Sequence, residues 1–95
     1  MIQKSKPLFQ LGKTVTTHGA LDALQSNNQS PLEFFERHSF GDWNELSPED
    51  REANDLALNN GDRIFSIYYL KDRTKIWIIT EADRSATTIL LPEEY

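Results

Sequence analysis

The sequence of 95 residues contains no cysteine, which excludes disulfide bonds, thiolate catalysis and zinc sites built on cysteine. It contains only two histidines, so a histidine-rich metal site is excluded as well, and we expect neither a metal nor another cofactor. The longest apolar run, residues 76–79, is far shorter than the roughly 20 residues that a membrane helix needs. No apolar stretch follows the lysines near the N-terminus, as it would in a signal peptide. We therefore expect a cytoplasmic protein without membrane contact.

Basic residues are also few. Ten lysines and arginines stand against 15 acids, and the net charge of −5 argues against a nucleic acid as a direct ligand. Residues 31–62 hold nine of the acids and only two arginines, so the negative charge is concentrated in the middle of the chain. Hydrophobic residues make up 38% of the chain, which suffices for one modest core. We expect a single domain over residues 1–95, with residues 1–7 as a flexible tail.

Three segments carry the signals of helix starts. Thr17 can cap a helix over about 18–26, and a serine followed by a proline precedes two further helices, over about 31–38 and 48–60. The apolar residues expected to face the core are Leu32 and Phe35 in the second helix and Ala53, Leu56 and Ala57 in the third.

The last third of the chain changes character. Residues 63–70, 75–81 and 87–91 are rich in β-branched and aromatic residues and are separated by short polar turns, which predicts three antiparallel strands. The segment 8–15 could add a fourth strand. We therefore predict an α+β fold in which two or three short helices pack on a three- or four-stranded antiparallel sheet. The sheet would contain a C-terminal β-meander, and the acidic helical middle would cover it.

Neither face of the predicted sheet is cleanly polar. Phe65, Ile67 and Tyr69 share one face of the first strand, and the opposite face is also largely apolar. A sheet with one face in water should alternate more sharply. Either a partner covers part of the second face, or that face carries an aromatic patch built from Trp77, Tyr69 or Ile79. Such a patch suits a protein partner, and a second copy of the chain, forming a homodimer, is one candidate.

Several motifs spread along the chain carry a resemblance to a known family. They are Leu11-Gly12, Gly19-Ala20-Leu21, Arg37-His38, Gly41-Asp42-Trp43 and the C-terminal blocks 77–85 and 87–95. Together they resemble a family of short bacterial proteins, found in cyanobacteria and proteobacteria, that are uncharacterised and often described as plasmid-related. The resemblance covers most of the chain. It implies no activity, but it suggests an accessory protein of mobile-element origin.

The turn after the second C-terminal strand gathers groups that catalysis uses. Glu81 could act as a general base and Arg84 could stabilise an oxyanion, with His38 as a general acid. The alternative is a structural turn, tied by the side chain of Asp83, in which Arg84 pairs with an acid. His38 would then end a helix, where a positive charge interacts favourably with the helix dipole. We favour the structural interpretation.

The Asp42-Trp43 pair lies between two predicted helices. It could form a binding loop in which Trp43 stacks on a ligand, or a turn in which Trp43 fills the core. We favour the turn, because a tryptophan in a small domain usually serves packing. The candidate binding residues are Asp42, Trp43, Tyr68, Trp77, Thr80, Asp83 and Ser85.

Three functions follow from these observations. Our leading hypothesis is a small non-enzymatic module that binds protein. The first alternative is a metal-independent hydrolase of the small-ribonuclease type, which rests on analogy of fold. Its site would consist of Arg63, Ser66, Tyr68, Thr80, Arg84 and His38. The second alternative is an acidic mimic of nucleic acid that inhibits a DNA-binding enzyme. Whether the chain is an enzyme stays open, and its excess of acids weighs against RNA cleavage.

Overall fold

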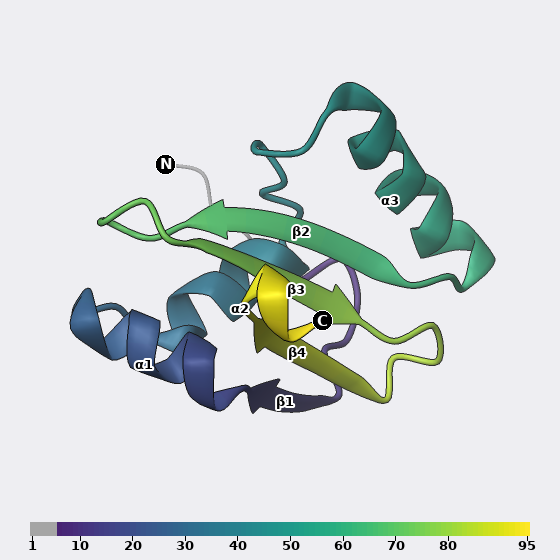
Figure 1. Cartoon of the computed structure of the whole chain (residues 1–95). Helices are drawn as coiled ribbons and strands as arrows, with labels where there is room; N and C mark the ends of the chain where they lie inside the picture. The colour runs from purple at the N-terminus through teal and green to yellow at the C-terminus, as the bar shows by residue number, and fades with distance from the viewer. Residues whose placement is uncertain (1–5) are drawn as a thin grey trace.

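Three helices, four strands and a short C-terminal turn make up the fold of this computed structural model, which describes residues 6–95 (Figure 1). The expected flexible tail falls largely on residues 1–5, which lie outside the described residues. The elements in chain order are β1 (Lys13–Thr16), α1 (His18–Ser26), α2 (Pro31–Ser39), α3 (Pro48–Asn60), β2 (Ile64–Tyr69), β3 (Lys75–Thr80), β4 (Ala86–Leu90) and the 3-10 turn η1 (Pro92–Glu94). None of the helices in residues 6–95 combines the length and the apolar character that crossing a bilayer requires.

The four strands form one sheet in the order β1-β4-β3-β2. β2 pairs antiparallel with β3, and β3 pairs antiparallel with β4. β1 pairs parallel with β4, so the sheet is mixed rather than wholly antiparallel. A parallel neighbour is possible here because three helices separate β1 from the other strands, and no short hairpin dictates its direction. The predicted α+β fold is confirmed.

The helices begin where the capping signals predict. The hydroxyls of Thr17, Ser30 and Ser47 each accept a hydrogen bond from a backbone N–H in the first turn of the following helix. α3 ends at Gly61, which takes the left-handed conformation with a φ of 75°. The local sequence therefore sets the ends of the helices.

α1 and α2 cover one face of the sheet, here called the inner face, and build the main core against it. The buried members of this core are Ala20, Leu24, Phe34, Phe35, Tyr68, Leu70, Ile76, Ile78 and Ile89. Leu32, which we expected in the core, is 62% exposed. The reason is that Phe34 and Phe35 occupy the buried positions of α2.

α3 flanks the free edge of β2 instead of covering the sheet (Figure 1). The side-chain amide of Asn54 donates to the carbonyl of Phe65 at 2.7 Å and accepts from the Phe65 N–H at 3.1 Å. Asn54 thus occupies the hydrogen-bonding positions that a further strand would use, and it blocks this edge. Of the expected apolar stripe of α3, Ala57 is buried, but Ala53 is exposed and Leu56 is 56% exposed, because the helix turns Asn54 and Ala57 inward.

Candidate functional site

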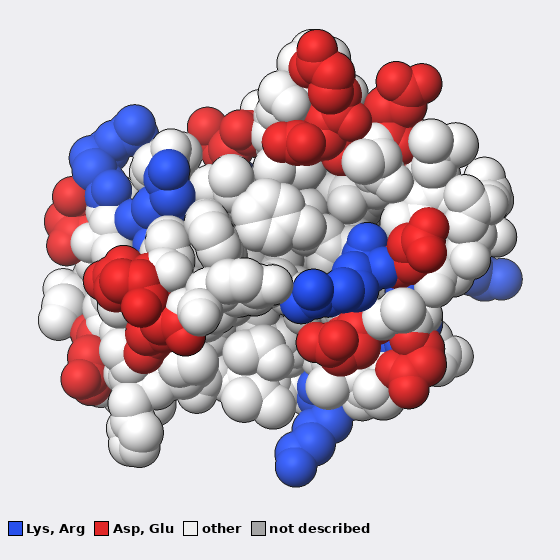
Figure 2. Space-filling model, turned by 45° about the vertical axis from the view of Figure 1, so that its right-hand side comes forward, with Lys and Arg blue, Asp and Glu red and all other residues white. Residues whose placement is uncertain are grey.

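The second face of the sheet, here called the outer face, carries no helix layer except η1. Its side chains come from alternate positions of β2 and β3, namely Phe65, Ile67, Tyr69, Lys75, Trp77 and Ile79. Ile79 is buried, while the apolar side chains of Phe65, Ile67, Tyr69 and Trp77 are only half-buried. Figure 2 shows largely uncharged surface across the middle of the molecule, with acidic residues gathered above it.

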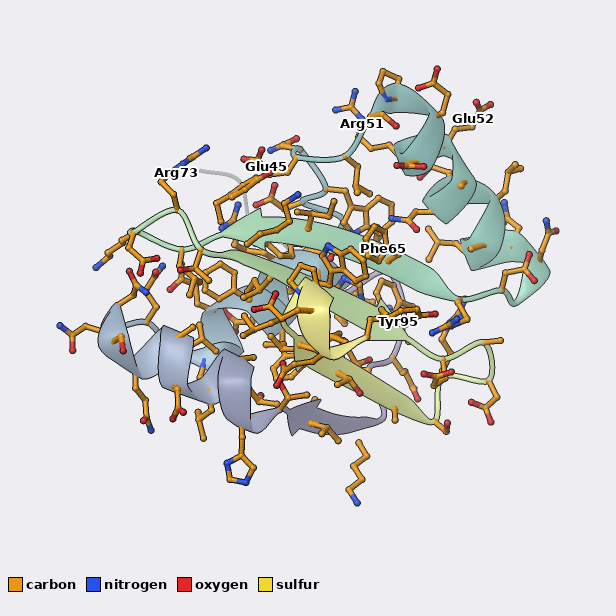
Figure 3. All side chains as sticks on the ribbon, viewed as in Figure 1. Glu45, Arg51, Glu52, Phe65, Arg73 and Tyr95 are labelled. Carbon is orange, nitrogen blue, oxygen red and sulfur yellow. The ribbon has the colours of Figure 1, made fainter. Side chains whose placement is uncertain are left out.

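An open hollow of about 290 Å³ lies on the outer face. Its lining residues are Arg63, Phe65, Trp77, Ile79 and Tyr95. The rings of Phe65 and Trp77 meet edge to face with their centroids 5.3 Å apart, and the Tyr95 ring lies 5.7 Å from Trp77. η1 brings Tyr95 back over the sheet, so that Phe65 and Tyr95 lie on the same side of the ribbon (Figure 3). A hollow of this size can take one large side chain of a partner.

Arg63 supplies the positive charge of the hollow. Its Nε lies 3.8 Å from Oε1 of Glu81, and its Nη1 donates to the Tyr95 hydroxyl over 3.5 Å. Both distances are long, and half of the Arg63 side chain is exposed. The hydrogen bond to Tyr95 raises the pKa of Arg63 above its usual value, and an arginine guanidinium is charged at neutral pH in any case. It therefore remains available to an acceptor on a partner.

The indole of Trp77 is incompletely satisfied. Its Nε1 is buried, and it has no hydrogen-bond partner among the described residues. A buried donor without an acceptor costs about 1–3 kcal/mol. Trp77, which carries this unsatisfied donor, lines the hollow next to the exposed ring of Tyr95.

The β2–β3 hairpin makes one end of the outer face basic. The Arg73 guanidinium lies over the Tyr69 ring, 4.7 Å from its centroid, and the Lys75 ammonium lies 5.8 Å from the same centroid. Tyr69 thus holds two cations on the outer face by cation–π contact.

The inner face holds a buried chain of polar side chains instead of a site open to substrate. His38 contacts Ser66 through Nδ1 at 2.5 Å and Thr80 through Nε2 at 2.9 Å. Thr80 is hydrogen-bonded to Thr87 at 2.7 Å, and the Thr87 hydroxyl donates to the Leu11 carbonyl at 2.7 Å. The four side chains are fully buried.

Burial determines the charge of His38. The side chain packs edge to face against Phe9, and desolvation lowers the pKa of His38 from 6.5 to about 3. His38 is therefore neutral near pH 7 and is enclosed by the core. The expected interaction of a charged His38 with the helix dipole is wrong for this reason.

The turn between β3 and β4 divides the catalytic candidates. Thr80 faces the inner side and binds His38, whereas Glu81 lies beside Arg63 of the outer face. The Arg84 guanidinium donates to four backbone carbonyls, those of Ala57, Asp62, Glu81 and Ala82, at 2.6–3.2 Å. Arg84 therefore joins the turn to the end of α3. The expected pairing of Arg84 with an acid is wrong, because backbone carbonyls take up its guanidinium.

Asp83 and Ser85 form the predicted local turn. Asp83 accepts from the Ser85 backbone N–H at 3.0 Å, and hydrogen bonds from Ser85 hold the pKa of Asp83 below its usual value. Both side chains are exposed. Their mutual contact accounts for the sequence pattern without a ligand.

The remaining candidates of the sequence lie on the helix side. Trp43 is 4% exposed, and its indole N–H donates to the His38 carbonyl at 3.0 Å, so it fills the core. Asp42 pairs with Arg37 at 2.7 Å, and Tyr68 donates its hydroxyl hydrogen to the Asp42 carbonyl at 2.9 Å. Burial raises the pKa of Tyr68 above its usual value. Of the candidate binding residues, Trp77 alone lies on the outer face.

Sequence reasoning missed Arg63 and Tyr95 as neighbours of Trp77. The alternation in β2 and β3 indicated an apolar outer face, but Tyr95 reaches it only through the turn that η1 makes after β4. Among residues 6–95, no three His, Cys, Asp or Glu side chains lie close enough together to hold a metal ion. The chain matches no known family model, no curated protein and no solved structure.

Proposed function

We propose that the chain is a non-enzymatic protein-interaction module and that the outer face of the sheet is its binding surface. The observation that carries this proposal is the hollow of about 290 Å³, whose walls are apolar or aromatic apart from the half-exposed Arg63. Aromatic and arginine side chains around a concave centre are typical of the residues that dominate protein interfaces. The indole of Trp77 contributes its half-buried ring to this surface, whereas its Nε1 is itself buried.

The hydrolase alternative receives less support from the same geometry. A general acid and base need access to a substrate and a common pocket. His38 is enclosed in the core, Glu81 lies beside the outer-face residue Arg63, and Arg84 is bound to backbone carbonyls. Three groups with these surroundings do not converge on one reacting atom.

A cytoplasmic accessory protein of mobile-element origin is part of the same proposal. It rests on the resemblance of the motifs at 11–12, 41–43 and 77–95 to the plasmid-related family. The acidic-mimic alternative needs acids along one exposed surface, and α3 offers four, Glu49, Asp50, Glu52 and Asp55. The complementarity described in the next subsection gives these acids a different role.

Site-directed photo-crosslinking tests the proposal. A benzophenone amino acid would replace Ile67 on the outer face or, as a matched control, Gln25 on the exposed side of α1, in cells that make the protein. We expect a discrete, protease-sensitive adduct from position 67, none from position 25, and loss of the adduct when Phe65→Asp is added. Equal labelling from both positions, or no protein adduct at position 67, would overturn the proposal.

A further inference from the structure

The outer face lies between two regions of opposite charge. The β2–β3 hairpin, residues 71–75, carries three cations and one acid, a net charge of +2. α3, at the other end of β2, carries four acids and one arginine, a net charge of −3. In Figure 3 Arg73 and Glu52 lie toward opposite ends of the molecule, and Phe65 and Tyr95 lie between them.

We propose that the partner of the outer face is a second copy of the chain, bound about a two-fold axis that crosses the strands. This inference rests on the proposed function and names its partner. Such an axis brings each basic hairpin opposite the other copy's acidic α3, and it brings the two apolar centres together. Both charge pairs form at once, because an isologous interface repeats every contact.

The charges also decide between the two possible axes in the plane of the face. An axis along the strands would place the two hairpins at the same end, so that like charges would meet there, and it would carry each α3 from the β2 edge to the β1 edge of the other copy. Arg73 and Lys75 lie on the outer face, because both contact the Tyr69 ring there, so they are positioned to meet the other copy. Electrostatic complementarity of this kind sets the orientation of partners.

Sedimentation equilibrium of the full chain, combined with charge reversal, tests the dimer. We expect a mass of twice 11.0 kDa at high micromolar concentration. The double variant Arg73→Glu/Lys75→Glu should weaken the dimer about tenfold, and Glu52→Lys/Asp55→Lys should do the same. An equimolar mixture of the two variants should form a heterodimer, since each then supplies the charge that the other lost.

The matched control reverses two acids on the helix side, Asp22→Lys/Glu36→Lys, which changes the net charge by the same amount as the α3 variant. Mixed with Arg73→Glu/Lys75→Glu, it keeps only one of the two charge pairs, so this heterodimer should be weaker than the one formed by the two charge variants. Circular dichroism and thermal unfolding establish that every variant is folded before its mass is interpreted.

Three sets of results would overturn this inference. A chain that stays a monomer at every concentration, while position 67 crosslinks to a different protein, refutes the second copy and leaves the proposed function standing. A dimer that neither charge variant weakens, or equal rescue by the helix-side control, refutes the two-fold arrangement. A monomer that also gives no crosslink refutes both proposals.

Discussion

The buried polar chain has only one consistent direction of hydrogen bonding, and Thr80→Val tests it. The Leu11 carbonyl can only accept, so the Thr87 hydroxyl hydrogen is used there. Thr80 must then donate to Thr87 and accept from His38 Nε2–H. Nδ1 of His38 is left to accept from the Ser66 hydroxyl. The structure therefore requires the neutral tautomer of His38 that is protonated on Nε2.

The expected loss of stability from Thr80→Val is about 2 kcal/mol. Valine keeps the shape of threonine but removes the hydroxyl, so the buried Nε2–H of His38 loses its acceptor at a cost of about 1–3 kcal/mol. Thr87 also loses the hydrogen bond that it accepts from Thr80, worth about 1 kcal/mol. The added methyl group recovers about 0.8 kcal/mol through burial.

A double-mutant cycle with His38→Leu isolates the reason for the loss. In the leucine background no imidazole N–H remains to be left without an acceptor, so Thr80→Val should cost about 1 kcal/mol or less. Urea unfolding followed by the fluorescence of Trp43 and Trp77 gives both free energies of unfolding. Long-range proton–nitrogen NMR of His38 reports the tautomer directly.

Either measurement can refute the reasoning. An equal loss from Thr80→Val in both backgrounds would mean that the His38 N–H does not depend on the Thr80 hydroxyl. A loss below about 0.5 kcal/mol would mean that the site does not desolvate its polar groups as the burial of Thr80 implies. An imidazole protonated on Nδ1 would reverse the deduced direction of the hydrogen bonds that His38 makes to Ser66 and Thr80.

Four further measurements test other contacts of the fold. Burial lowers the pKa of His38 to about 3, so unfolding takes up a proton at any pH between about 3 and 6.5. The free energy of unfolding should therefore decrease by about 1.4 kcal/mol for each unit by which the pH is lowered through this range, and the His38 contribution should stay constant above pH 7. Equilibrium unfolding across pH measures this slope, and His38→Leu should remove it. Gly12→Ala should lower the free energy of unfolding by more than about 2 kcal/mol, because Gly12 has a φ of +66° and the added Cβ would collide with the Arg84 carbonyl oxygen. In Gly61→Ala the added Cβ meets open space, so that variant should lose only about 1 kcal/mol. Comparable melting temperatures for the two glycine variants would contradict this. Asn54→Leu should lower the free energy of unfolding by about 2–3 kcal/mol and raise aggregation, because it leaves the backbone groups at the β2 edge without partners. Light scattering measures the aggregation, and an unchanged solubility would argue that the edge needs no cover. Arg84→Lys should lose about 1–2 kcal/mol in urea unfolding, because an ammonium cannot reach carbonyls on both the turn and α3, and full stability would show that those contacts are dispensable.

The elements themselves could be predicted from the sequence because short-range chemistry sets them. The hydroxyls of Thr17, Ser30 and Ser47 and the glycine after α3 mark helix ends through contacts within one turn. The alternation around Phe65 likewise separates the two faces of β2, because it depends only on the pleat of the strand. The apolar outer face was predictable on the same basis.

The contacts between distant segments could not be predicted in this way. In the sequence Asn54 is an ordinary polar residue of an acidic helix. Only the packing of α3 against the β2 edge allows its side chain to bond the backbone of Phe65. The parallel pairing of β1 depends on the path of three intervening helices. The partners of Arg84 could not be predicted, because its four acceptors are backbone carbonyls, which every residue has and which no sequence pattern marks.

The inner face of the sheet buries a polar chain within its apolar core, whereas the outer face leaves aromatic rings half-exposed, and this contrast is the physical reason to seek function on the outer face. The inner face buries a histidine and three hydroxyls, which is tolerable only because each finds a partner within the chain. The outer face leaves Phe65, Tyr69 and Trp77 half-exposed, with an indole N–H that no described residue satisfies. Exchanging hydroxyls and aromatic rings between the faces would give a simpler core and a more soluble surface. Our proposal accounts for the half-exposed apolar rings, because a protein surface docked on the outer face would remove them from water.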